Sequence, residues 1–577
     1  MKQRYTKLIA VAAAVAMTAG VLSGCGSQDD KKTASDTVTK QNTVSVTVKD
    51  TTENNTVDAP TGGNTEKGIP AVEGERAESY DRTLKSEAVM DAAGGVFVDF
   101  GGEEYKGHTD NAFTLVSEQP LSTFSTDVDT ASYANTRRFL NEGMKPYPDA
   151  VRSEEFINYF NYGYAAPAGD DPISITTQLS DGSFIDGSKT KLLLVGLKAK
   201  DIEVKDRPAM NIVLLIDVSG SMKSSLKLPL AVKAFKLLSQ SLNQNDRVSI
   251  VTYSGEEKTV LEGALGSETG KIAAALDSLV AHGATAGEAG INMAYSLAEK
   301  YFIEGGNNRI VMATDGDLNV GVSSEEELKE LVERKRESGV FLSVLGFGTG
   351  NFKDARLEAL ADNGNGNYSY IDSEQEAEKV LSAELSGTLF TVAKDVKAQI
   401  EFDPKAVAAY RLIGYENRAL NDEDFVDDTK DAGDMGAGHE VTIIYEIVPA
   451  NGVLGSDGIC GTPISCTPGE APAEQPENLA SVKIRYKQPD GDVSKELSKT
   501  VKVSEHTEDV PEELAFAYCA ATFAKLLRSE GNSSMMLHLA EVLRQRDLLT
   551  DSYRQEFAEL IKTAAALYMG GSGNENG

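Results

Sequence analysis

The sequence predicts a multidomain α/β protein, in which a doubly wound, mostly parallel sheet is inserted into a β-sandwich and helical segments lie at both ends. Between residues 207 and 386, short apolar runs alternate with helical periodicity, which indicates repeated strand–helix units. Period-two alternation precedes this region at residues 173–179 and returns after it at residues 482–486. Because a two-stranded hairpin alone is marginal, we expect both strand sets to complete one sandwich.

The N-terminus has the features of an export signal. Three cationic side chains within the first seven residues precede an apolar stretch, residues 8–22, that is too short to span a bilayer comfortably. The stretch ends in Leu22-Ser23-Gly24-Cys25, which resembles a bacterial lipobox, in which the Cys thiol receives a diacylglyceryl group. Because two acyl chains anchor a protein stably, we expect lipidated Cys25 to hold the mature protein on the extracytoplasmic face of the cell membrane. An ordinary cleaved signal with an incidental Cys is the alternative.

The segment after Cys25 differs in composition from the rest of the chain. Residues 26–79 contain no aromatic residue and no Leu. Such a segment buries too little apolar surface to offset its chain entropy, so we expect a disordered tether. Aromatic residues return from Phe113, and a capping sequence before Tyr133 predicts a small, mainly helical module. Apolar periodicity between residues 511 and 568 predicts helices at the C-terminus.

These features divide the 577 residues into seven expected segments. The order is a lipoprotein signal peptide (1–24), a disordered tether (25–108), the N-terminal helical module (109–170), the first sandwich strands (171–206), the α/β domain (207–386), the remaining sandwich strands (387–508) and the C-terminal helices (509–570). The tether is expected to give the folded part reach from the membrane.

The charge of the chain argues against one class of partner. It has 56 Lys and Arg against 89 Asp and Glu, a formal net charge of −33. Because cationic side chains drive nucleic-acid binding by displacing counterions, we expect no nucleic-acid partner. The glycine motif Gly346-x-Gly348-x-Gly350 follows a predicted strand, but its spacing is not the dinucleotide fingerprint. We therefore interpret the motif as a tight loop, with no nucleotide bound.

Oxygen-bearing side chains gather where predicted strands of the α/β domain end, and in one loop before a helix. They are Asp217, Ser219, Ser221, Thr285 and Asp315. Ligands of open α/β sheets bind at the carboxyl ends of the strands. Carboxylates and hydroxyls suit Mg²⁺ or Mn²⁺, whereas Zn²⁺ would call for Cys or His. The alternative is that the two serines only cap the next helix.

The same five residues resemble the metal-ion-dependent adhesion site of the von Willebrand factor type A (VWA) domain. That site is Asp-x-Ser-x-Ser, matched by Asp217, Ser219 and Ser221, with a Thr and an Asp from two later loops, matched by Thr285 and Asp315. The resemblance implies that the hydroxyls coordinate the cation directly and that the acidic residues help directly or through water. It also implies that one coordination position is left for a carboxylate of a partner.

The resemblance extends over about residues 113–568, and it is to bacterial VWA lipoproteins. Four runs outside the metal motif carry it, together with the helical C-terminal segment; the runs are residues 124–133, 154–160, 346–351 and 360–368. Ala284 stands where that family often has another small or polar residue, and this departure leaves every metal position in place.

Two further features bear on chemistry. Cys460 and Cys466 bracket a five-residue loop, and after export a disulfide between them is one expectation and two free thiols the other. Cys519 lies on an apolar helix face, which predicts a buried thiol. Residues 421–434 hold seven acidic residues but lack the EF-hand spacing, so we expect a solvated loop rather than a Ca²⁺ site.

These features predict a non-enzymatic, membrane-anchored protein that binds a protein ligand through a Mg²⁺-type site, for adhesion, envelope assembly or scaffolding. One alternative is a metal-dependent hydrolase using Asp217 and Asp315. It is disfavoured because neither a nucleophile elbow nor a His-Glu-x-x-His helix is present, and His282 is a lone loop histidine. The other alternative is a VWA domain with a purely structural role.

Overall fold

The structure is a computed structural model. It describes residues 103, 105, 107–202, 207–283, 287–316, 325–349, 354–384, 390–450, 452, 476–489, 491–529 and 531–570, all within one compact unit, Arg82–Gly577. The signal peptide, Cys25, most of the tether, Thr285 and the pair Cys460 and Cys466 lie outside these residues. Within them, no helix is long and apolar enough to cross a membrane.

A sheet in the order β10-β9-β8-β5-β6-β7 forms the centre of the α/β domain. Its strands are β5 (Met210–Asp217), β6 (Arg247–Tyr253), β7 (Glu257–Leu265), β8 (Asn307–Thr314), β9 (Phe341–Phe347) and β10 (Tyr368–Ile371). Neighbouring strands are parallel, except that the edge strand β7 runs antiparallel to β6. The predicted mostly parallel sheet is therefore confirmed, and β7 is an addition that its polar sequence did not suggest.

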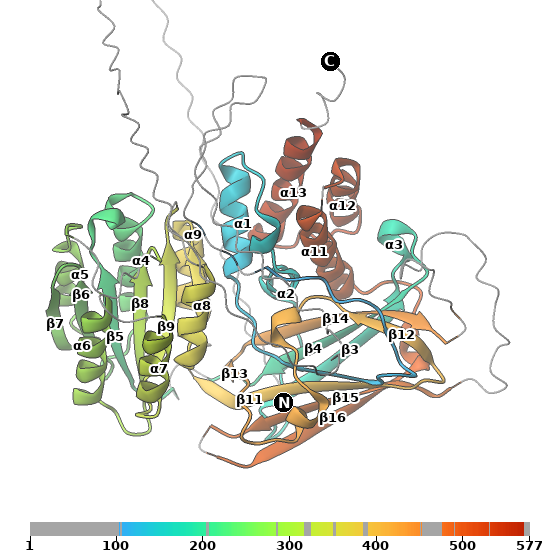
Figure 1. The fold of residues 1–577 in the computed structure, drawn as a ribbon, viewed down its shortest axis with the longest axis horizontal. Helices are drawn as coiled ribbons and strands as arrows, with labels where there is room; N and C mark the ends of the chain where they lie inside the picture. The colour runs from blue at the N-terminus through green and yellow to red at the C-terminus, as the bar shows by residue number, and fades with distance from the viewer. Residues whose placement is uncertain are drawn as a thin grey trace, which may run out of the picture. The chain divides into compact units, whose positions relative to one another are not determined.

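Helices cover both faces of this sheet (Figure 1). They are α4 (Leu228–Gln240), α5 (Thr269–Asp277), α6 (Gly287–Lys300), α7 (Glu325–Arg336), α8 (Asp354–Asn363) and α9 (Glu374–Glu378), which continues into η3 (Lys379–Glu384). Ile212 and Leu214 of β5 pack in one core with α4 and α5, and Val213 and Leu215 pack in another with α6 and α7. Every residue of β5 is buried, because a strand covered on both faces has no solvent side.

Strands from before and after the α/β domain pair with one another. One sheet has the order β1-β12-β14-β4-β3-β17 and is antiparallel except that β17 runs parallel to β3. A second, antiparallel sheet has the order β13-β11-β15-β16, with β2 also paired to β11. The bounds are β1 (Thr114–Leu115), β2 (Leu121–Ser125), β3 (Ile173–Asp181), β4 (Lys191–Ala199), β11 (Thr391–Phe402), β12 (Val407–Leu412), β13 (Gly433–Gly436), β14 (Glu440–Pro449), β15 (Asn478–Lys487), β16 (Ser494–Lys502) and β17 (His506–Thr507). Leu194 of β4 lies opposite Ile444 of β14, so the chain returns to the same sheet after the α/β domain.

The two antiparallel sheets share one hydrophobic core. Val195 and Leu197 of β4 contribute from one sheet, and Val482 and Ile484 of β15 contribute from the other. Burial alternates along β15, as expected for a strand with one face toward a core.

The N-terminal module differs from its predicted, mainly helical form. Helices α1 (Ala131–Asn141) and α2 (Ser153–Asn158) are present, but β1 and β2 belong to the two antiparallel sheets. Ser122 of β2, for example, lies opposite Ile400 of β11. The strands were missed because each is short and is defined only by a partner far along the chain.

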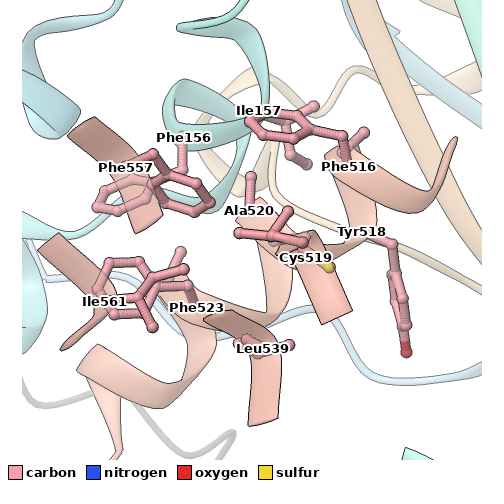
Figure 2. Close-up of a cluster of buried hydrophobic side chains, with 14 of the residues drawn as sticks. Phe156, Ile157, Phe516, Tyr518, Cys519, Ala520, Phe523, Leu539, Phe557 and Ile561 are labelled. Carbon is pink, nitrogen blue, oxygen red and sulfur yellow. The ribbon is translucent and has the colours of Figure 1, made fainter. Parts of the chain in front are cut away.

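The C-terminal segment is helical and packs against α2. Its helices are α11 (Glu512–Arg528), α12 (Ser533–Gln545) and α13 (Ser552–Gly570). The remaining described elements are short and lie elsewhere in the chain: α3 (Ser183–Asp186) and the 3₁₀ turns η1 (Pro148–Ala150), η2 (Gly220–Lys223), η4 (Glu416–Arg418), η5 (Asp422–Phe425) and η6 (Val503–Glu505). Phe156 of α2 meets Phe516, Phe523 and Phe557 in one apolar cluster (Figure 2). Cys519 is a free, buried thiol in this cluster, and burial raises its pKa to about 12.

Two arginines tie α8 of the α/β domain to the N-terminal module and to η4. Arg418 lies 3.1 Å from Asp362, 3.2 Å from Asp129 and 3.2 Å from Glu358, and Arg152 lies 2.9 Å from Asp354. We call this cluster the acidic joint; its members are Asp127, Asp129, Arg152, Glu155, Asp354, Glu358, Asp362 and Arg418.

Candidate metal site

The predicted metal ligands within the described residues meet at the carboxyl ends of two neighbouring strands. Asp217 is the last residue of β5, and Asp315 directly follows β8. The two strands are parallel and adjacent, with Ile216 opposite Ala313, so their ends lie at the same edge of the sheet. We call the site that Asp217 and Asp315 form there with Ser219 and Ser221 the crevice, because ligands of open α/β sheets bind at this edge. Both carboxylates are almost completely buried, with Asp217 at 0% and Asp315 at 1% exposure.

The serines lie on the loop that leaves β5. The backbone N–H of Ser219 donates to Oδ1 of Asp217 at 2.8 Å, which turns the loop back over the strand end. The hydroxyl oxygens of Ser219 and Ser221 lie 2.9 Å apart. The structure therefore brings three of the predicted oxygen ligands together on one tight turn.

The residues that lead into Thr285 run beside the serine loop, although Thr285 itself lies outside the described residues. Gly283 O accepts from the backbone N–H of Gly220 at 3.0 Å, and the backbone N–H of His282 donates to Val218 O at 2.7 Å. The side chain of His282 is exposed, so this residue contributes to the site through its backbone.

A tyrosine adjoins the buried carboxylates. Tyr253, the last residue of β6, lies opposite Asp217 in the sheet and is fully buried. Burial raises the pKa of its hydroxyl well above 10, and the nearby carboxylate of Asp217 raises it further. The phenol therefore stays neutral at physiological pH and adds no negative charge to the crevice.

Sequence reasoning missed Lys227, which lies at the N-cap of α4. Its Nζ donates to Oδ2 of Asp315 at 2.8 Å, and its side chain is only 9% exposed. The residue falls outside the Asp-x-Ser-x-Ser pattern. No local signal in the sequence indicates that its ammonium group reaches a carboxylate from another strand.

Gly348 provides the room for this lysine. A Cβ added at Gly348 would overlap Cγ and Cε of Lys227, and the glycine has a φ of +78°, which an L side chain rarely adopts. The hydroxyl of Tyr370 donates to Gly348 O at 2.7 Å and holds this turn in position. The central glycine of the Gly346-x-Gly348-x-Gly350 motif thus lies against the metal crevice through Lys227.

The chemistry of this donor set fits a hard divalent cation. The described donors are carboxylate and hydroxyl oxygens, which Mg²⁺ and Mn²⁺ prefer. Among the described residues, no group of three or more His, Cys, Asp or Glu side chains is arranged to hold a metal. The candidate site differs from such a group, because it has two carboxylates and hydroxyl oxygens. The ammonium group against Asp315 shows that the crevice accommodates positive charge.

The acidic stretch at residues 421–434 is held by cations of the protein itself. Lys397 Nζ donates to the backbone oxygens of Asp424 at 3.0 Å and Asp427 at 2.6 Å. Arg485 pairs with Asp428 at 3.0 Å. The stretch is therefore fastened to strands β11 and β15 rather than being a freely solvated loop.

The parallel sheet with its carboxylate and hydroxyl crevice defines the class of the protein as a VWA domain protein. The family model described as "von Willebrand factor type A domain" matches residues 211–383, and one described as "von Willebrand factor" matches residues 99–193. The chain belongs to the family of YfbK. It is 40% identical over 506 residues to "Uncharacterized protein YfbK" of Escherichia coli K12, covering 85% of each chain, and the model "Uncharacterized protein YfbK, C-terminal" matches residues 387–567.

Other similarities are more distant. A Synechocystis protein, "Uncharacterized protein sll0103", is 30% identical over 209 residues, which cover 36% of this chain and 48% of that protein. The solved structure of a "von Willebrand factor type A from Catenulispora acidiphila" is 15% identical, covers 70% of this chain and 98% of its own, and has a TM-score of 0.40. The VWA family commonly mediates protein–protein interactions.

Proposed function

We propose that this protein captures a protein ligand through a divalent cation, Mg²⁺ or Mn²⁺. Asp217, Ser219, Ser221 and Asp315 would hold the cation, together with Thr285. The observation that carries the proposal is the pair of hydroxyl oxygens of Ser219 and Ser221, 2.9 Å apart on the turn that starts at buried Asp217. When bound, the cation supplies a coordination position that a carboxylate of the partner completes.

The charge of the chain gives the cation a second role. With a net charge of −33, most of the surface repels an acidic partner. A bound divalent cation is a large local charge, so it supplies the positive potential that lets a carboxylate dock. Adhesion, envelope assembly and scaffolding all use binding of this kind.

The role proposed is binding rather than catalysis. Around the crevice, Asp217 and Asp315 are engaged with the serine loop and Lys227, and the exposed His282 adjoins the site through its backbone. General acid–base chemistry needs a group poised to exchange a proton with the substrate. Metal-dependent hydrolysis of phosphate or peptide substrates by the purified protein would contradict this proposal.

A pull-down from cell envelopes tests the binding proposal. Cross-linked partners should be recovered with Mg²⁺ and lost with EDTA, and Asp217→Ala should lose them in both conditions. A Ser224→Ala variant, changed later in the same connection between β5 and α4, is the matched control and should behave as wild type. Capture that resists EDTA and is equally strong in Asp217→Ala would contradict the mechanism.

We also propose that lipidated Cys25 anchors the protein at the extracytoplasmic face of the cell membrane. The lipobox-like sequence supports this, because two acyl chains attached at one thiol anchor stably. Cys25→Ala should move the protein from the membrane fraction to the soluble fraction. An unchanged membrane fraction would contradict the anchor.

For the architecture, we propose that the two antiparallel sheets form one β-sandwich into which the VWA domain is inserted, with helical segments at both ends. The pairing of β4 with β14 and the core shared by Val195 and Val482 support this. Replacing residues 203–389 by a short linker should leave the antiparallel sheets folded, as measured by circular dichroism. Complete loss of β structure in that deletion would contradict the proposal.

A further inference from the structure

The charge balance of the metal crevice depends on a residue outside the metal motif. Asp217 and Asp315 each bring a carboxylate, and the Nζ of Lys227 lies 2.8 Å from Oδ2 of Asp315. A carboxylate buried to this degree is costly unless a positive charge pairs with it. Among the described residues, Lys227 is therefore the counter-ion of one of these two carboxylates, that of Asp315.

The position of this ammonium group is built into the fold. The backbone of Lys227 is held at the start of α4, where its N–H donates to Ser224 O at 3.0 Å and its oxygen accepts from Ala231 N–H at 2.9 Å. Its aliphatic stem crosses Gly348, where no side chain competes for the space. A side chain confined at both ends keeps its charge in the crevice.

We infer that Lys227 is a specificity-determining residue of the metal site, which weakens binding of the cation alone and favours a cation that arrives with an anionic partner. The inference rests on the proposed metal site. Before loading, the described charged groups of the crevice are two carboxylates and one ammonium group, so a divalent cation gives this set one excess positive charge. A partner carboxylate neutralises that excess, so cation and partner strengthen each other's binding.

A purely structural role of Lys227 would give a different experimental result. If Lys227 only fastens α4 to the loop after β8, its loss lowers stability without changing metal affinity. Replacing it with Met keeps most of the apolar stem and removes the charge, whereas replacing it with Arg keeps the charge. The pair of variants therefore separates electrostatics from packing.

The test is titration of the mature full chain with Mn²⁺, by calorimetry and by the electron paramagnetic resonance signal of free Mn²⁺. Lys227→Met should bind Mn²⁺ at least about tenfold more tightly than wild type, because one unit of like charge is removed from the crevice. Lys227→Arg should stay near wild type, and Asp217→Ala should lose binding. Mn²⁺ should also raise the melting temperature of Lys227→Met by more than that of wild type.

The outcomes separate this inference from the proposed function. Equal or weaker Mn²⁺ binding by Lys227→Met, with wild type binding through Asp217, overturns the role of Lys227 and leaves the metal site standing. Absence of Mn²⁺ binding in wild type and in Lys227→Met overturns both.

Discussion

The metal crevice and the acidic joint both bury carboxylates, but they balance the charge in different ways. In the crevice, the ammonium group of Lys227 contacts Asp315, and the backbone N–H of Ser219 donates to Asp217. In the acidic joint, two guanidinium groups, those of Arg152 and Arg418, hold six carboxylates within 4 Å.

This difference explains why one cluster suits a ligand and the other suits a permanent contact. A guanidinium group presents five N–H donors in a rigid fork and engages several carboxylates at once. The acidic joint is closed by such contacts between α8, η4 and the N-terminal module. An ammonium group is a compact point charge, so the crevice retains oxygen atoms with capacity for a further cation.

The largest expected effect comes from breaking the acidic joint. Arg418→Met leaves four carboxylates without the cation they share, so the free energy of unfolding should fall by about 3–5 kcal/mol. Urea denaturation at pH 7 measures the change. The control is Arg334→Met, whose pair with Glu330 is about two-thirds exposed and should cost less than about 0.5 kcal/mol. Equal effects of the two variants would show that the joint is not a stabilising contact.

An intermediate effect is expected on the crevice side, at Gly348. Gly348→Ala places a Cβ against Lys227 and forces an L side chain to adopt a φ of +78°, so it should cost about 1–3 kcal/mol of unfolding free energy. The matched control is Gly255→Ala, because a Cβ at Gly255 meets no atom within 4 Å. Thermal and urea unfolding of both variants measure the difference. A Gly348→Ala protein as stable as the control would mean that Lys227 moves aside freely.

The smallest expected effect is on the pH dependence of stability, at a carboxyl group beside the acidic joint. Asp434 lines a cavity of about 240 Å³ together with Asp127, Asp362 and Arg418. Burial raises its pKa to about 7, so its contribution to stability is fully present below its unfolded pKa and is lost as the pH rises through about 7. Asp434→Asn should therefore flatten the fall in stability between about pH 4 and pH 7, by about 1 kcal/mol because Asp434 is partly exposed.

Urea denaturation across this pH range is the measurement. Asp492→Asn, at an acid in the turn before β16, should leave the pH profile as in wild type. A steeper pH dependence in Asp434→Asn would mean that the carboxylate is stabilised in its charged form.

Much of the candidate metal site was predictable because three of its residues are close in sequence. Asp217, Ser219 and Ser221 follow one apolar strand, so their convergence is a property of a single turn. Asp315 could be added because the carboxyl ends of parallel strands meet at one edge. The strand–helix alternation that predicted a doubly wound α/β domain is equally local, since each apolar run is predicted as one strand or one helix.

Lys227, β2 and Arg418 illustrate what local patterns could not supply. The ammonium group of Lys227 reaches Asp315 only because α4 begins beside the loop after β8 and Gly348 leaves space for the stem. β2 is a strand only because β11 offers it a hydrogen-bonding edge. Arg418 meets α8 and the N-terminal module only when distant segments fold together.

The sequence pattern was thus sufficient for the parallel strands and the helices of the VWA domain, although not for the edge strand β7, and for the oxygen ligands on its first loop. Both depend on residues that are close together along the chain. Tertiary folding decided which charges are paired and how much positive charge the crevice already contains. Ion pairs act through space, and their partners here are separated by many residues of chain. The balance between Lys227 and Asp315, and with it the expected response to a metal ion, therefore becomes visible only in the folded protein.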